Sequence, residues 1–209
     1  AWGGPAKGYE WGDMEHSLSV DHQDNVWITF HNPLERSWSA PLDRTDDMFL
    51  KFTSKGKFIR QFGGRDRHPL GVGANTDTTS VHLATDAAVF PKTNEAFLAD
   101  GYLNKRVAVI DGTSGKMKRF WGAYGGKPDD TTPGPYDPSA PPARQFRNPV
   151  HCADLSNDGF LYVCDRANDR IQVFTKDGKF VKEQFVAKRS LADGSVWDIA
   201  FSKDPQQKY

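Results

Sequence analysis

The stretch HCADLSNDGFLYVCDRANDRIQVFTKDGKFVKEQF, residues 151–185, decides the fold. It holds four short runs in which apolar and polar residues alternate, as they do in half-buried strands. Asp158-Gly159 separates the first two runs, and Asp177-Gly178 separates the last two. Such dipeptides supply the positive φ that a tight hairpin needs. The stretch therefore predicts one unit of strand, turn, strand, loop, strand, turn and strand.

The same layout occurs twice more toward the N-terminus. One copy reads DAAVFPKTNEAFLADGYLNKRVAVIDGTSGKMKRFWG from Asp86; the other reads HSLSVDHQDNVWITFHN from His16 and continues as DMFLKFTSKGKFIRQFGG from Asp47. Four-stranded units repeated along a chain are typical of a β-propeller, in which each unit is one blade. We therefore predict an all-β fold made of propeller blades. Three copies are fewer than the roughly four to eight blades of a propeller, so we expect a segment of a longer ring.

The repeats divide the chain into parts of one partial propeller domain, residues 1–209. The Gly-rich start resembles the tail of a preceding blade, and Asp198-Ile-Ala-Phe resembles the start of a further one. Residues 33–46 and 125–147 interrupt the pattern and are rich in Pro, Asp or Arg, so we predict loops there. The expected parts are a tail at 1–15, blades at 16–64, 81–126 and 148–186, and the start of a further blade at 195–209.

Composition excludes two classes of partner. Lys plus Arg and Asp plus Glu both number 27, so the chain lacks the basic surplus that attracts nucleic-acid phosphates. Its apolar runs are strand-sized, well short of the about 20 residues of a membrane-spanning helix. The first residues show no secretory leader, which fits a processed form or a piece of a longer protein. The state of the two cysteines, Cys152 and Cys164, stays open, because two are too few for a disulfide scaffold and their spacing does not fit a CxxC pair.

Residues at the start of each first strand suggest a metal site, because these strands line the channel of a propeller. The aligned residues are His16, Asp86, His151 and Asp198. In a six-bladed ring, alternate blades are related by about 120°. A third histidine beyond residue 209 would then complete the three-histidine set of catalytic zinc. The alternative is that each histidine only bonds neighbouring backbone.

The loop after the second strand of each blade opens on the same side. It carries His31, Tyr102 and Arg166 in the three copies. Arginine presents a planar fork suited to a carboxylate, and a tyrosine near a cation can act as a base. Pairing within the repeats is the better interpretation of Asp100, Asp165, Arg106 and Arg170. His22, His68 and His82 lie off the pattern, and we assign them no function.

Several motifs resemble peptidyl-α-hydroxyglycine α-amidating lyase, a six-bladed propeller of the NHL-repeat superfamily. They are EHSLSVD, ADGYLNKR, NPVHCADL and CDRANDRIQ, within a resemblance that runs from Glu15 to about Val186. It implies zinc ligands at His16 and His151, a catalytic Tyr102 and a functional Arg166. His31, Asp86 and Asp198 are further residues that could line the site. The resemblance also implies a third zinc histidine and structural calcium ligands outside this segment, and a secreted or otherwise extracytoplasmic location.

The function implied is cleavage of the C–N bond of a peptidyl-α-hydroxyglycine to a peptide amide and glyoxylate. We expect the ring to need its remaining blades, from the same protein or another subunit, and the segment alone to be inactive. Two alternatives stay open. One is a non-catalytic propeller that binds a protein or small ligand. The other is a six-bladed hydrolase with a channel Ca²⁺, for which Asp86 and Asp198 are the natural oxygen ligands.

Overall fold

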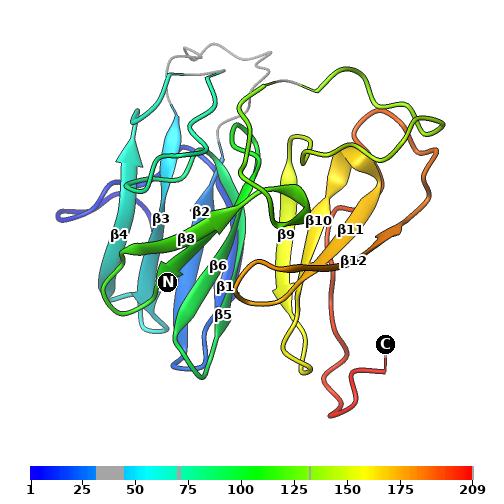
Figure 1. Ribbon diagram of the computed structural model, residues 1–209. Helices are drawn as coiled ribbons and strands as arrows, with labels where there is room; N and C mark the ends of the chain where they lie inside the picture. Colours follow the sequence, from blue (N-terminus) through cyan, green and yellow to red (C-terminus); the bar gives the residue numbers. More distant parts are fainter. Residues whose placement is uncertain (32–44, 70–71, 132, 209) are drawn as a thin grey trace.

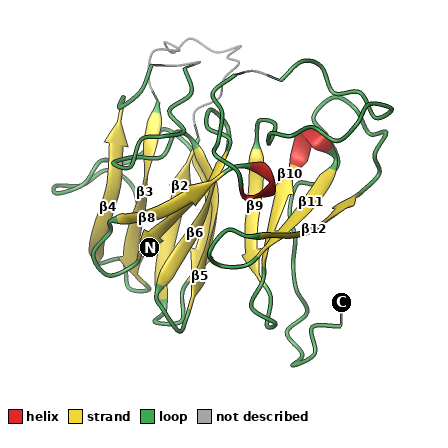
Figure 2. Ribbon diagram, in the orientation of Figure 1, coloured by secondary structure: helices red, strands yellow, loops and turns green. Residues whose placement is uncertain are grey.

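Alternating sequences fold into three separate four-stranded antiparallel sheets (Figures 1 and 2). The computed structural model describes residues 1–31, 45–69, 72–131 and 133–208. Within these ranges the only helical elements are two short 3-10 turns, Ala123–Gly125 and Arg166–Asn168. The prediction of an all-β fold is confirmed.

Each sheet is one copy of the repeat. The first consists of β1 (Glu15–Val20), β2 (Asn25–Phe30), β3 (Asp46–Thr53) and β4 (Phe58–Arg65). The second consists of β5 (Ala84–Phe90), β6 (Glu95–Asp100), β7 (Arg106–Asp111) and β8 (Met117–Trp121). The third consists of β9 (Val150–Leu155), β10 (Leu161–Asp165), β11 (Arg170–Phe174) and β12 (Phe180–Phe185). Within each sheet, every strand pairs with the next one along the chain.

The three sheets are arranged as propeller blades. The first strands lie together in the middle, where β1 packs against β5 and β5 against β9, while β4 and β12 lie toward the outside (Figure 1). This order of strands from the inside to the outside is that of a β-propeller. The described part of the second insertion, 125–131 and 133–147, forms no strand. Most of the first insertion, residues 32–44, lies outside the described ranges.

The hairpins form where the sequence predicted them. Between the third and fourth strands of the blades, Gly56, Gly115 and Gly178 have φ of 81°, 73° and 90°. Between the first two strands, Asp24 and Asn94 adopt φ of 59° and 54°. Asp and Asn tolerate this left-handed region better than most residues because their short side chains bond locally. The turn chemistry thus fixes the register of each hairpin.

Apolar side chains of neighbouring blades share their cores. Phe97 and Val109 of the second blade pack with Val150, Val163 and Phe174 of the third. Burying these side chains removes apolar surface from water and fixes the blades against one another.

Buried ion pairs stabilise the second and third blades, and their arginines also bond the loops that precede these blades. Arg106 Nε lies 2.7 Å from Asp100 and Arg170 Nε lies 2.7 Å from Asp165, all four side chains being fully buried. The first arginine also donates to the carbonyl of Ser80. These pairs therefore have the structural role that the repeats predicted.

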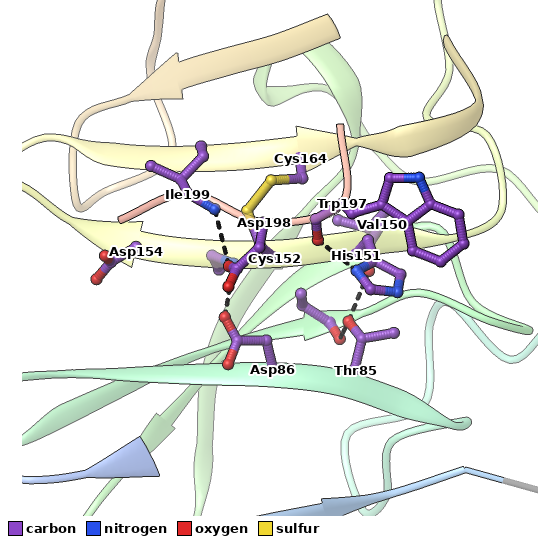
Figure 3. The surroundings of a disulfide bond; sticks show 12 residues. Thr85, Asp86, Val150, His151, Cys152, Asp154, Cys164, Trp197, Asp198 and Ile199 are labelled. Carbon is purple, nitrogen blue, oxygen red and sulfur yellow. Dashed lines mark hydrogen bonds between the residues drawn. A yellow bond between two sulfur atoms is a disulfide. The ribbon is translucent and has the colours of Figure 1, made fainter. Parts of the chain in front are cut away.

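Cys152 and Cys164 form a disulfide, which settles the state that the sequence left open (Figure 3). The two residues are directly opposite each other on β9 and β10. The bond joins the strand that carries His151 to the strand that leads into Arg166. Among the described residues, no helix has the length and apolar character to cross a bilayer.

Candidate active site

Four predicted residues come together although up to 150 positions separate them in the chain. His16 lies on β1, His151 on β9, Tyr102 in the loop after β6, and Arg166 in the turn after β10. The Tyr102 hydroxyl lies 3.3 Å from His16 Nε2 and 3.4 Å from His151 Nε2. The ring centroids of the two histidines are 5.1 Å apart. The phenol oxygen therefore sits between two imidazole nitrogens.

Irregularities at the start of the inner strands aim the two histidines. His16 and His151 both lie where the strand register shifts. His16 Nδ1 lies 2.8 Å from the carbonyl oxygen of Thr85, and His151 Nδ1 lies 2.5 Å from that of Trp197. A carbonyl can only accept, so each Nδ1 carries the proton and each Nε2 presents a lone pair. This is the tautomer that a metal ligand needs.

The strand register corrects one detail of the sequence alignment. In β5 the register shift falls between Ala84 and Asp86, so Thr85 stands where the other blades carry a histidine. Thr85 also accepts the His16 hydrogen bond, as Trp197 accepts that of His151. Thr85 and Trp197, rather than Asp86 and Asp198, are thus the counterparts of the two histidines. A repeat alignment misses this because a bulge adds one residue to one strand.

The loop of Tyr102 is fixed by close packing and by one amide. A Cβ on Gly101 would lie 2.0 Å from the carbonyl oxygen of Val150, so only glycine fits there. Asn148 Nδ2 lies within hydrogen-bond distance of the carbonyl oxygens of Gly101, Tyr102 and Asn104, at 2.9–3.0 Å. The Asp-Gly-Tyr order therefore reflects the geometry that holds the phenol in place.

Arg166 lies beside this cluster with its guanidinium near two aromatic rings. Its central carbon is 4.1 Å from the Trp197 ring centroid and 5.9 Å from that of Tyr102. Nε donates to the carbonyl of Asp193 at 2.8 Å. Within the described residues the terminal nitrogens make no hydrogen bond beyond a 3.9 Å approach to the exposed Asp193 carboxylate. They are placed to bind a carboxylate.

His31 joins the site as a buried imidazole. It is 9% exposed, and its ring centroid lies 3.9 Å from that of Tyr102 and 5.6 Å from that of His16. Its Nδ1 is buried with no hydrogen-bond partner in the described part of the chain. His31 therefore lies against Tyr102 and close to His16.

Burial keeps the site histidines neutral. It lowers the pKa of His151 to about 4, with further lowering from His16 and Arg166. Burial and the neighbouring His16 lower the pKa of His31 to about 4. Burial also lowers the pKa of His16. Neutral imidazole is the form that binds metal ions.

The residues present fit a metal in part. Two imidazole Nε2 atoms converge, but no group of three or more His, Cys, Asp or Glu side chains in the described ranges could hold an ion. Within the described ranges, His16 and His151 could thus supply two ligands to an ion.

Asp86 and Asp198 line the channel rather than the histidine cluster (Figure 3). They border an open cavity of about 750 Å³ between the inner strands, together with Asp154. Asp86 accepts from the Ser17 hydroxyl at 2.9 Å and from the Ala153 amide at 3.2 Å. Burial and then the repulsion from Asp198 raise the pKa of Asp86.

Sequence reasoning missed Asn148 and Trp197. Asn148 could have been found from the pair Asn-Pro that precedes β9, which is typical of a turn. Trp197 had no signal of its own, because its role depends on its carbonyl and on the position of its ring over Arg166.

No family model matches the chain. Peptidyl-glycine alpha-amidating monooxygenase A of Xenopus laevis is 36% identical over 171 residues, which is 81% of this chain and 15% of that protein. Peptidyl-alpha-hydroxyglycine alpha-amidating lyase 1 of Drosophila melanogaster is 26% identical over 84% of this chain and 29% of its own length. The WD40 β-propeller domain of Doa1 superposes with a TM-score of 0.47 at 12% identity, over 83% of this chain and 41% of that one. The resemblance to amidating proteins is confirmed over most of the chain, which spans less than a third of either relative.

Proposed function

We propose, from the premise that this chain is a relative of the α-amidating lyases, that it carries half of the active site of such a lyase. The reaction is cleavage of the C–N bond of a peptidyl-α-hydroxyglycine, which gives a peptide amide and glyoxylate. The observation that carries the proposal is the Tyr102 hydroxyl between His16 Nε2 and His151 Nε2, at 3.3 and 3.4 Å. A hydroxyl and two neutral imidazoles with free lone pairs are the components of metal-assisted proton transfer.

The residues divide the reaction between them. Zinc, when held by His16, His151 and a third ligand, would act as a Lewis acid toward the α-hydroxyl. Arg166 binds the substrate carboxylate through its terminal nitrogens and thereby fixes the α-carbon near the phenol. Tyr102 relays one proton: its oxygen accepts the proton of the substrate hydroxyl while its own proton passes to the amide nitrogen as the C–N bond breaks. The former hydroxyl oxygen keeps the electron pair of its O–H bond and becomes the aldehyde oxygen of glyoxylate.

Glyoxylate release from α-hydroxyhippurate by the full-length protein tests this proposal. Tyr102→Phe removes the proton acceptor without changing the ring, so the rate is expected to fall about 100-fold or more. Tyr162→Phe is the matched control, since Tyr162 lies on β10 and its ring packs against Phe201. An unchanged rate in Tyr102→Phe would remove the tyrosine from the mechanism, and no glyoxylate from the wild-type protein would remove the lyase.

The disulfide supports an extracytoplasmic location, because such bonds persist in oxidising compartments. The open channel supports a role for the remaining blades, whether from the same protein or another subunit, in closing the ring. We therefore propose an extracytoplasmic location and a ring that is closed by further blades.

A hydrolase with channel calcium is the second candidate, because the carboxylates of Asp86, Asp154 and Asp198 border one cavity. Among the described residues they do not form a group that could hold an ion by itself, so this candidate needs further oxygen ligands. Burial and the neighbouring carboxylates of Asp86 and Asp198 raise the pKa of Asp154. Metal analysis separates the candidates. Zinc that is lost in His16→Ala supports the lyase, calcium without zinc supports the hydrolase, and no bound metal supports a non-catalytic binding propeller.

A further inference from the structure

We propose that Trp197 is a positioning residue that holds Arg166 and His151 in one fixed arrangement. By holding Arg166, Trp197 gives the site its preference for a substrate with a free carboxylate. This inference rests on the proposed function, because it concerns the same arginine and histidine. The segment 193–197 reaches both residues through separate contacts, one from the backbone and one from the indole ring.

The backbone contact holds the metal-ligand candidate. The carbonyl oxygen of Trp197 lies 2.5 Å from His151 Nδ1, and the two rings meet edge to face with centroids 5.4 Å apart. Figure 3 shows Trp197 beside His151 above the inner strand β9. A hydrogen bond to the second nitrogen of a metal-binding imidazole fixes both its tautomer and its direction.

The ring contact holds the arginine. The indole lies against the guanidinium, with the central carbon 4.1 Å from the ring centroid, closer than the 5.9 Å to Tyr102. Stacking on a tryptophan face is the favoured geometry for a guanidinium. The arginine side chain is only 9% exposed, so little water competes with this contact.

The segment is itself locked in place. The Trp197 indole N–H donates to the carbonyl of Gly194 at 3.1 Å. Gly194 has φ of 84°, and a Cβ there would lie 2.0 Å from the carbonyl oxygen of Arg166. Ser195 N donates to the Asp169 carboxylate at 2.7 Å. Sequence positions 193–197 therefore bring the indole to the guanidinium by close backbone packing.

The consequence is a rigid guanidinium with a defined open edge. Its central carbon lies close to the Trp197 ring and within 5.9 Å of the Tyr102 ring centroid, and its Nε is used by Asp193, so the terminal nitrogens remain for a ligand. A planar fork that is fixed beforehand binds a carboxylate at a lower entropic cost than a mobile one. Loss of the indole is expected to weaken carboxylate binding and to leave the proton-transfer group in place.

Binding of hippurate to the full-length protein, measured by calorimetry, tests the inference without any turnover. Trp197→Leu keeps apolar volume but removes the π face, and hippurate is expected to bind about tenfold more weakly. Trp197→Phe keeps an aromatic face, and its affinity is expected within about threefold of wild type. Trp2→Ala, a half-exposed tryptophan on the first blade, is the control that leaves affinity unchanged. Hippuramide, which lacks the charge, is expected to bind all variants equally.

Turnover separates this inference from the proposed function. In Trp197→Leu, KM for α-hydroxyhippurate is expected to rise about tenfold with kcat nearly unchanged. Wild-type affinity for hippurate in Trp197→Leu would overturn the inference even if the lyase reaction were confirmed. Conversely, weakened hippurate binding in that variant supports the inference even if no glyoxylate were released. Failure of the wild-type protein to bind hippurate would overturn the carboxylate role of Arg166 and the inference together.

Discussion

Two pairs of histidines in this molecule have nearly the same ring geometry and opposite surroundings. The rings of His16 and His151 are 5.1 Å apart at 71°, and those of His68 and His82 are 5.1 Å apart at 66°. In the first pair, backbone carbonyls occupy Nδ1 and both Nε2 atoms point at a phenol. In the second pair, carboxylates bind the rings directly.

The difference shows which hydrogen-bond partners leave a histidine pair free to bind a ligand. His82 Nδ1 lies 2.5 Å from the carboxylate of Asp47 on β3, and both side chains are fully buried. This contact joins the first blade to the segment that enters the second. His68 Nε2 is shared by Asp77 and Ser80, at 3.0 and 2.7 Å. A ring held by carboxylates stabilises the fold, whereas a ring held by carbonyls keeps one nitrogen for another partner.

The largest expected difference is in metal binding and activity. His151→Ala removes one of the two nitrogens that converge on Tyr102, so zinc affinity of the full-length protein is expected to fall more than about 100-fold. Loss of an outer partner alone already costs about 10- to 100-fold. Glyoxylate release is expected to fall in parallel. Metal content after dialysis and the rate with α-hydroxyhippurate are the two measurements.

His68→Ala is the matched control, because this ring lies in the second pair and is partly buried like His151. It is expected to leave zinc content unchanged. Equal loss of zinc in His68→Ala and His151→Ala would show that the two pairs do not differ in function.

The expected loss of stability has the opposite order: a substitution in the second pair lowers the free energy of unfolding more than one in the first pair. His82→Ala leaves the buried Asp47 carboxylate without its imidazole partner, which costs about 3 kcal/mol of the free energy of unfolding. His16→Ala removes a half-buried ring that bonds only a carbonyl and a phenol, and about 1 kcal/mol is expected. Urea denaturation of the metal-free protein measures both values. A loss of equal size in the two variants would contradict the structural role of His82.

Much of this contrast could be read from the sequence, since repeats place His16 and His151 at matching positions and leave His68 and His82 off the pattern. The hairpins could be predicted because Asp-Gly and Lys-Gly favour the required φ locally. The shift by one residue from Asp86 to Thr85 could not, because a bulge depends on the pairing of two strands. The contacts of Trp197 were equally invisible, since a backbone carbonyl has no signature in the sequence.

His31 lies between the two classes, because it is buried like His82 but touches Tyr102 and has no partner for Nδ1. Its pKa of about 4 is below that of an unfolded histidine, near 6.5. The unfolded chain therefore takes up protons first as the pH falls. Stability from this group is fully present above about pH 6.5 and is lost as the pH falls toward 4.

The variant His31→Phe isolates this effect. His151 titrates in the same range, and Asp46, whose burial raises its pKa to about 6, acts in the opposite direction, so the wild-type curve alone is ambiguous. The stability advantage of His31→Phe over wild type is expected to grow between pH 6.5 and pH 4.5. Urea midpoints of the metal-free proteins at several pH values measure it, and a constant difference would show that His31 does not titrate on unfolding.

The smallest expected effect is that of the same substitution at pH 7.5. Phenylalanine keeps the ring against Tyr102 and removes a buried nitrogen that has no partner in the described structure. An unpaired buried polar atom costs about 1 kcal/mol or more, so His31→Phe is expected to stabilise the protein by about that amount. Glyoxylate release is expected to stay within about threefold of wild type, because a ring contact is all that this side chain supplies. His31→Ala, which removes the ring as well, is expected to lower both stability and rate. A large loss of activity in His31→Phe would instead assign the imidazole to the reaction and place His31 with His16 and His151.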